Sequence, residues 1–278
     1  MLRAGRGFTL PEMVLAMVLT VWLGGVVSAM LVSTEMVVRH QNGRMELYRT
    51  IRSGALFLAR ETTGLVSGPD PDLLLMAPDR IHYRALRGLG VSCGARPDTL
   101  LIRQDLRFGV RSWQPYIDSL RLYVMGDTAR GSMDRWERLP LVSVSAHSCP
   151  SGASALALGT RFPSGFVPAV DLAPGAPVVV FEPTEIRLYQ SGGREWLGLR
   201  SLSGGGNIQP ALGPLAAAGL EFVFLDRAEA PTTDPQQVAA VVMTLRAESF
   251  GEVRRGLGHP GGRLIDSQTV WVTLRNLP

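Results

Sequence analysis

The residue best placed to do chemistry in this chain is a single carboxylate at the start of a long apolar segment. Glu12 directly follows Phe8-Thr9-Leu10-Pro11, and no charged residue occurs from Met13 to Thr34. A carboxylate in apolar surroundings costs several kcal/mol unless a cation pairs with it. The first turns of a helix tolerate negative charge, but this alone gives no reason to place one there. Glu12 is therefore a candidate for charge pairing.

The two cysteines, Cys93 and Cys149, are a second candidate pair. Neither belongs to a C-x-x-C motif, and two thiols are too few for a structural zinc site. In an oxidising compartment they could form a disulfide, worth about 4 kcal/mol on the chain-entropy model. Two unrelated buried thiols are the alternative, and the sequence leaves both open.

Common catalytic and metal-binding patterns do not occur in the sequence. The histidines form neither H-x-x-x-H nor H-E-x-x-H, and there is no nucleophile elbow, Walker A motif or dinucleotide fingerprint. His147 lies two residues from Cys149 but lacks a third group to orient a base. Asp226, Glu229 and Asp234 form an acidic loop that could hold calcium, but the absence of EF-hand spacing favours a solvated loop. We expect no enzymatic activity, no cofactor and no metal, with calcium as an open alternative.

Composition leaves one further ligand open. The formal net charge is +4, the pI is about 9.6 and the chain contains no lysine. Guanidinium groups suit phosphates, so nucleic-acid binding is one interpretation. The arginines are scattered rather than clustered, which favours a bias toward arginine codons instead.

The N-terminus has the form of a short leader followed by a membrane helix. Residues 1–7 are polar and basic, and the apolar run that follows spans about 33 Å as a helix, enough to cross a bilayer core. The run continues past Ala29, the faint site for an ordinary signal peptidase, so we expect it to be retained. Four arginines after the run oppose an N-in orientation, but the basic leader favours it, and we predict a cytoplasmic N-terminus. We predict a leader at 1–7 and a transmembrane helix at 8–34.

The sequence Gly7-Phe8-Thr9-Leu10-Pro11-Glu12 resembles the cleavage and methylation signature of type IV prepilins and type II secretion pseudopilins. The resemblance implies cleavage after Gly7 by a prepilin peptidase and N-methylation of Phe8. It also implies that Glu12 pairs with the free N-terminal ammonium of a neighbouring subunit, since two charges that are costly alone are tolerable together. The implied partners are other pilin or pseudopilin subunits, the peptidase and the inner-membrane assembly machinery.

The helix is expected to continue beyond the membrane over residues 35–63. Tyr48, Ile51, Ala55 and Leu58 recur at three- and four-residue steps and predict an apolar stripe facing the following domain. Major pilins usually carry a proline where this chain has Ala29. This departure favours a minor pilin or pseudopilin.

Residues 64–278 predict a β-rich periplasmic domain, which makes the fold class α+β with a long N-terminal helix packed on antiparallel strands. Gly-rich residues 203–207 either divide two β lobes or form a plain loop. The predicted strands are 81–86, 99–107, 119–125, 141–146, 177–181, 184–190, 195–201, 220–225, 238–247 and 269–274.

The C-terminal half resembles larger minor pilins of the PilW type and J-type pseudopilins, through Gly219–Asp226, Val238–Leu245 and the ending Thr273-Leu274-Arg275-Asn276. Residues 88–175 match no known pattern and predict an insertion or an enlarged sheet. The resemblance implies a filament subunit of the inner membrane that primes or caps assembly of a pilus or pseudopilus. A signal-anchored periplasmic enzyme and a DNA-binding tip subunit are the alternatives.

Overall fold

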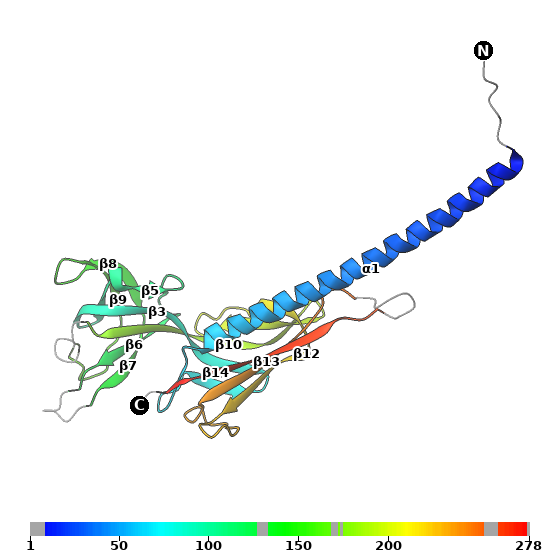
Figure 1. The fold of residues 1–278 in the computed structure, drawn as a ribbon. Helices are drawn as coiled ribbons and strands as arrows, with labels where there is room; N and C mark the ends of the chain where they lie inside the picture. Colours follow the sequence, from blue (N-terminus) through cyan, green and yellow to red (C-terminus); the bar gives the residue numbers. More distant parts are fainter. Residues whose placement is uncertain (1–8, 127–132, 168–171, 173–174, 253–260, 277–278) are drawn as a thin grey trace, which may run out of the picture. The chain divides into compact units, whose positions relative to one another are not determined.

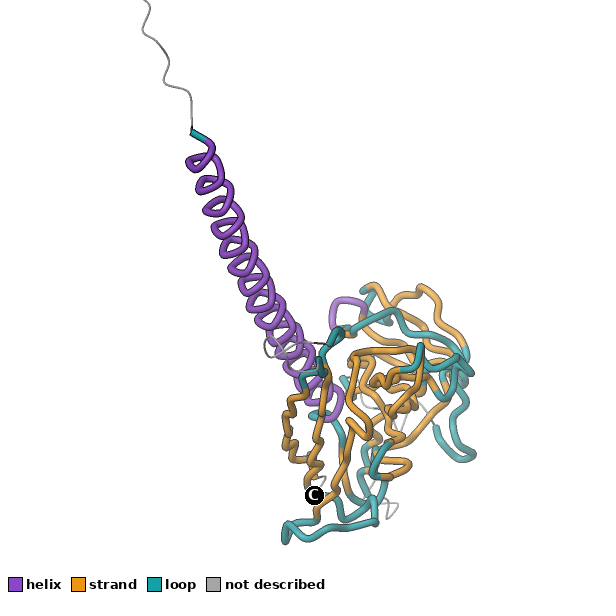
Figure 2. Tube along the Cα trace, turned by 90° about the vertical axis from the view of Figure 1, so that its right-hand side faces the viewer, coloured by secondary structure: helices purple, strands orange, loops and turns teal. Residues whose placement is uncertain are grey.

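The computed structural model describes residues 9–126, 133–167, 172, 175–252 and 261–276. The chain divides into two units, residues 1–49 with 248–266 and residues 50–247 with 267–278. A long helix precedes an almost entirely β-stranded region, so the protein is α+β (Figure 2). The elements are α1 (Leu10–Thr62), β1 (Val66–Ser67), β2 (Leu73–Ala77), β3 (Arg80–Arg96), β4 (Thr99–Arg103), the 3-10 helix η1 (Gln104–Leu106), β5 (Phe108–Gly109), β6 (Ser119–Val124), β7 (Arg135–Pro140), β8 (Ser143–Ser148), β9 (Ser154–Gly159), β10 (Pro177–Ser191), β11 (Arg194–Ser201), β12 (Gln209–Leu225), β13 (Ala240–Glu248), β14 (Ile265–Thr273) and β15 (Arg275–Asn276).

Helix α1 runs without a break for 53 residues. Its only proline, Pro11, lies in the first turn, where a missing N–H costs no helical hydrogen bond. The Met13 N–H donates to the Thr9 carbonyl at 3.2 Å, and at the other end Thr62 Oγ1 donates to the Leu58 carbonyl at 2.7 Å. The predicted membrane segment and its predicted continuation over residues 35–63 thus belong to one helix.

The end of α1 packs on strands β12 and β13. Ile51, Ala55 and Leu58 are buried, as the stripe predicted. A Cβ at Gly54 would collide with side chains of Leu212 and Leu245, so the glycine permits the close approach of helix and sheet.

The prediction of the stripe is wrong for its remaining residue, Tyr48. Tyr48 is 65% exposed, whereas its neighbour Leu47 is 5% exposed. Leu47 and Ile51 are four residues apart and share a helix face, while Tyr48 is rotated off it by one position.

Strands β3 and β10 form the centre of the sheet. They pair antiparallel, and the strand order is β14-β13-β12-β11-β10-β3-β4-β9-β8, with β6 joined to β10 and β7 to β6. Strands β6 to β9 lie at one end of β3 and β10, and β12 and β13 lie at the other (Figure 1). A core at the β6–β9 end contains Leu100, Ile102, Leu120, Leu158 and Val178.

The two strands predicted at 177–181 and 184–190 are a single strand, β10. Pro183 lies between the two predicted ranges, and a proline cannot donate to a sheet ladder. In the structure it lies where β10 changes partners, between its pairing with β6 through Phe181 and its pairing with β11 from Thr184. The backbone N–H that Pro183 lacks is therefore missing at the point where the partner strand changes from β6 to β11.

Residues 203–207 do not divide two lobes. They connect β11 and β12, which are hydrogen-bonded neighbours in one sheet. Residues 88–175, in contrast, enlarge the sheet. They supply the second half of β3 and strands β4 to β9, of which β5, β7 and β9 were not predicted.

The C-terminal strand returns to the residues that follow the helix. Strand β15 pairs in parallel with β1, and the Arg275 N–H donates to the Leu65 carbonyl at 3.0 Å. The predicted final strand, 269–274, corresponds to β14, which ends at Thr273.

Candidate functional site

Glu12 lies in the first turn of α1, at the start of the helix. Its Oε2 accepts hydrogen bonds from the backbone N–H and from Oγ1 of Thr9, both at 2.9 Å. This contact is one half of a capping box, in which a glutamate at the third helical position closes back on the capping residue. No ion pair of Glu12 occurs among the described residues. The predicted processing residues Gly7 and Phe8 lie outside them.

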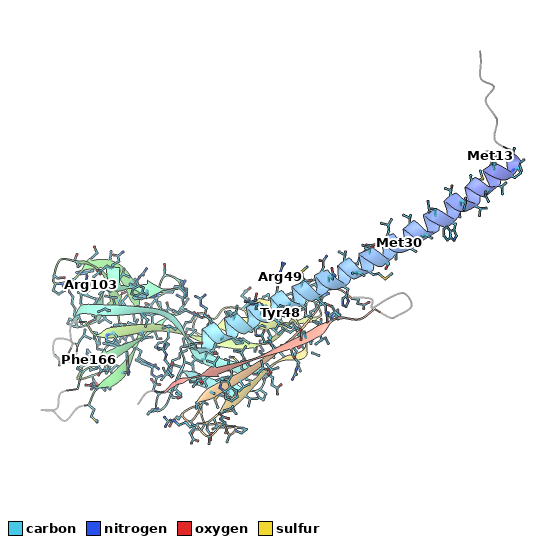
Figure 3. The ribbon with its side chains drawn as sticks, viewed as in Figure 1. Met13, Met30, Tyr48, Arg49, Arg103 and Phe166 are labelled. Carbon is cyan, nitrogen blue, oxygen red and sulfur yellow. A yellow bond between two sulfur atoms is a disulfide. The ribbon has the colours of Figure 1, made fainter. Side chains whose placement is uncertain are left out.

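The first half of α1 presents apolar side chains on all sides. Every residue from Thr9 to Glu35 is exposed, including Leu10 at 80%, Val21 at 76% and Trp22 at 68%. Figure 3 shows the side chains standing out from this segment between Met13 and Met30. The helix is long and apolar enough to cross a membrane, and an apolar surface of this extent requires a lipid or protein environment.

Cys93 and Cys149 form a disulfide, with their Cα atoms 5.7 Å apart. The bond joins the second half of β3 to the turn after β8. The sequence left open whether the two cysteines pair or are separate thiols, and in the structure they pair.

In the acidic loop, aspartate side chains accept hydrogen bonds from backbone N–H groups of the same loop. Oδ1 of Asp226 accepts hydrogen bonds from the backbone N–H groups of Ala228 and Ala230, at 2.8 and 2.9 Å. Oδ1 of Asp234 accepts the N–H of Gln236 at 2.9 Å. Within the described ranges, no three metal-ligating side chains gather at this loop or elsewhere.

Sequence reasoning missed a buried ion-pair network around Asp72. Arg121 donates to Asp72 Oδ1 at 2.8 Å, and Arg84 lies 3.6 Å from the same atom. Asp70 contacts both arginines and also Arg138, at 2.9 Å. Burial raises the pKa of Asp72, although Arg121, Arg84 and a backbone N–H oppose that rise. Burial likewise lowers the pKa of Arg84, against the attraction of Asp70.

A second network joins the end of α1 to β3 and β10. Glu182 Oε2 accepts from Arg87 Nε at 2.7 Å and from Arg111 at 3.0 Å. Arg87 also lies 3.5 Å from Glu61 of the helix, whose carboxylate accepts the Tyr83 hydroxyl at 2.7 Å. Burial, followed by the Glu61 charge, raises the pKa of Tyr83, so the hydroxyl stays a donor.

Two adjoining cavities flank Leu86 and Leu89 of β3, which contribute to both. The first, called here the apolar cavity, has a volume of about 320 Å³ and includes Leu65, Phe108 and Val110 in its wall. The second, called the arginine cavity, has a volume of about 750 Å³. Its lining combines apolar and aromatic side chains with four arginines, Arg60, Arg84, Arg121 and Arg275. These arginines are widely spaced in sequence, so no local motif predicts that they line one cavity.

The chain matches no protein-family model, no curated protein and no solved structure.

Proposed function

We propose that the protein is a minor pilin or pseudopilin, a subunit of a type IV pilus or a type II secretion filament. The supporting observation is the start of α1. One carboxylate, Glu12, lies in the first turn of a helix whose residues through Glu35 are all exposed and mostly apolar. A filament in which several such helices pack together covers this surface, and an N-terminal ammonium in that core supplies the cation for Glu12.

In this proposal α1 first spans the inner membrane and is then drawn into the filament. The β-rich region lies in the periplasm, where the Cys93–Cys149 disulfide is compatible with an oxidising environment. The subunit has no enzymatic role. We assign it a role in priming or capping assembly. The ground for this is that its sequence lacks the helix proline of major pilins.

Intact-mass measurement of the protein extracted from membranes tests this function. We expect a mass that lacks Met1–Gly7 and gains one methyl group on Phe8. The Gly7→Leu variant provides the control and should keep its full length. A wild-type chain that is uncut, or cut near Ala29, would contradict the proposal.

A further inference from the structure

The four arginines of the arginine cavity fall into two classes. Arg84 and Arg121 are buried, at 8% and 7% exposure, and both pair with Asp70 and Asp72. Arg60 and Arg275 are exposed, and neither forms an ion pair among the described residues. Folding therefore uses the first two guanidinium groups and leaves the other two available on the wall of the cavity.

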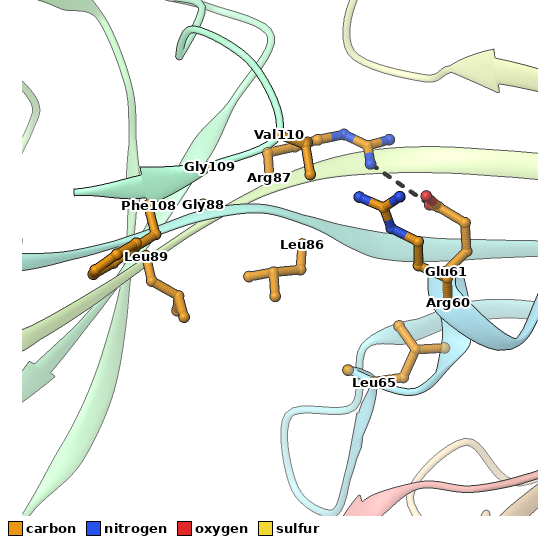
Figure 4. A pocket seen from close by; sticks show the side chains of 11 residues that line it. Arg60, Glu61, Leu65, Leu86, Arg87, Gly88, Leu89, Phe108, Gly109 and Val110 are labelled. Atoms are coloured by element: carbon orange, nitrogen blue, oxygen red, sulfur yellow. Dashed lines mark ion pairs between the residues drawn. The ribbon is translucent and has the colours of Figure 1, made fainter. Parts of the chain in front are cut away.

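The adjoining apolar cavity places exposed apolar side chains beside these arginines. Phe108 is 67% exposed and Val110 60%, while Leu86 and Leu89 are each 44% exposed. Figure 4 shows Phe108 next to Leu89, with Leu86 between them and the helix end that carries Arg60. Arg60 lines both cavities and Arg275 lines the arginine cavity, so a ligand lying across both would contact the apolar side chains and these two guanidinium groups.

We propose that the two cavities bind an extended peptide segment of a partner protein that carries a carboxylate beside apolar side chains. The carboxylate binds Arg60 and Arg275, because guanidinium groups match carboxylates with paired hydrogen bonds. The apolar side chains cover Leu86, Leu89 and Phe108. This inference concerns the β-rich region and does not depend on the proposed filament function.

The chemistry of the wall favours this occupant over other anions. Asp72 also lines the arginine cavity and pairs with Arg84 and Arg121, so two guanidinium groups of the wall remain for a ligand. A nucleic acid would need a row of exposed cations along its phosphates, whereas this wall offers two. The volume of about 750 Å³ lies in the range of pockets that enclose a drug-sized molecule, and it exceeds what one small ion fills.

A peptide pair tests the proposal on the full chain in nanodiscs of zwitterionic lipid. The probe is fluorescein-labelled Gly-Gly-Leu-Phe-Leu with a free carboxyl terminus, compared by fluorescence anisotropy with the same peptide as its terminal amide. Empty nanodiscs give the background. We expect the carboxylate form to bind at least about tenfold more tightly, which is typical for losing a charged hydrogen-bond partner. Equal binding of the two forms, or no saturable binding of either, would overturn the proposal.

Variants locate the contacts. The double variant Arg60→Gln/Arg275→Gln should remove the difference between the two peptides. Phe108→Ser should weaken both forms by the same factor, because it removes apolar contact and no charge. Arg161→Gln changes an exposed arginine outside the cavities and should change neither affinity. A double variant that keeps the tenfold preference would overturn the assignment of Arg60 and Arg275.

Two competition arms exclude other sources of the anion. Inorganic phosphate at the concentration of the peptide should displace little of it, and complete displacement would mean a site for a small anion. Binding should also persist in nanodiscs that contain anionic lipid. Its loss there would assign the cavities to lipid headgroups and overturn the proposal for a peptide.

Discussion

Two carboxylates in this protein meet the same physical problem in different ways. Asp72 is 6% exposed, and the chain supplies Arg84 and Arg121 around it. Glu12 lies at the start of a helix segment whose apolar residues are all exposed, and its hydrogen bonds to described residues are those from Thr9. Desolvation penalises both charges once their surroundings exclude water.

The difference indicates where each compensating cation comes from. A charge buried during folding needs a cation from the same fold, and Asp72 has two within 4 Å. A charge buried only on assembly can take its cation from another molecule. The described part of the chain provides Glu12 with a cap and with no cation. The capping contact is a competing explanation for Glu12, and it must be separated from charge pairing by experiment.

The largest expected effect separates these two explanations. Glu12→Gln keeps an oxygen that can accept from Thr9 and removes the charge. If Glu12 pairs with an ammonium inside a filament, its incorporation should fall by about a hundredfold or more, because breaking a buried pair costs about 3–5 kcal/mol. Insertion into the membrane should be unchanged. The measurement is the amount of subunit in sheared filaments relative to the membrane fraction.

Glu35→Gln is the matched control for this variant. It removes an acid further along the same helix, where Glu35 forms an exposed ion pair with Arg39 that is worth little. Its incorporation should equal that of the wild type. If Glu12→Gln also incorporates normally, capping is sufficient to explain Glu12 and the pairing role is wrong.

The next effect concerns the network around Asp72. Arg121→Gln leaves Asp72 and Asp70 with one fewer cation, and we expect a loss of about 3 kcal/mol in the free energy of unfolding at neutral pH. The loss should shrink at acidic pH, where Asp72 is protonated. Urea unfolding of the full chain in detergent measures both values. Arg96→Gln, at an exposed position, should change stability by less than about 0.5 kcal/mol, and an equal effect of the two variants would contradict a special role for Arg121.

Local patterns were enough to predict the helix and much of the sheet. The apolar run, the absence of proline after Pro11 and the spacing of Ile51, Ala55 and Leu58 all act within one or two helical turns. They predicted a helix that the structure confirms over Leu10–Thr62. The predicted strand 220–225 lies within β12, where the alternating residues Phe222 and Phe224 are buried.

Features that depend on contacts distant in sequence could not be predicted. Ranges 177–181 and 184–190 join into β10 across Pro183, where β6 gives way to β11 as a partner strand, and no local pattern reveals that change. Arg84, Arg121 and Arg275 lie far apart in the chain, and only the sheet places them on one cavity. Glu12 was identified because its signal is local, whereas the arginine cavity had no local signal.

The smallest expected effect is a difference in how two buried carboxylates make the stability depend on pH. Burial raises the pKa of Glu182, but hydrogen bonds from Ser201, Arg87 and Arg111 outweigh it, so its net pKa lies below 4.5. Glu182 therefore adds stability above 4.5, and this contribution disappears as the pH falls through its lowered pKa. The raised pKa of Asp72 has the opposite sign: its contribution is full below 3.8 and is lost as the pH rises through the raised value.

The two substitutions should consequently change the pH profile of stability in opposite directions. Glu182→Gln should lose less stability than the wild type on acidification below pH 4.5. Asp72→Asn should lose less than the wild type as the pH rises above 3.8. Urea midpoints across this range give both slopes from the same protein preparations. Slopes of the same sign would mean that the arginines around Asp72 outweigh its burial, and Asp72 would then resemble Glu182 rather than contrast with it.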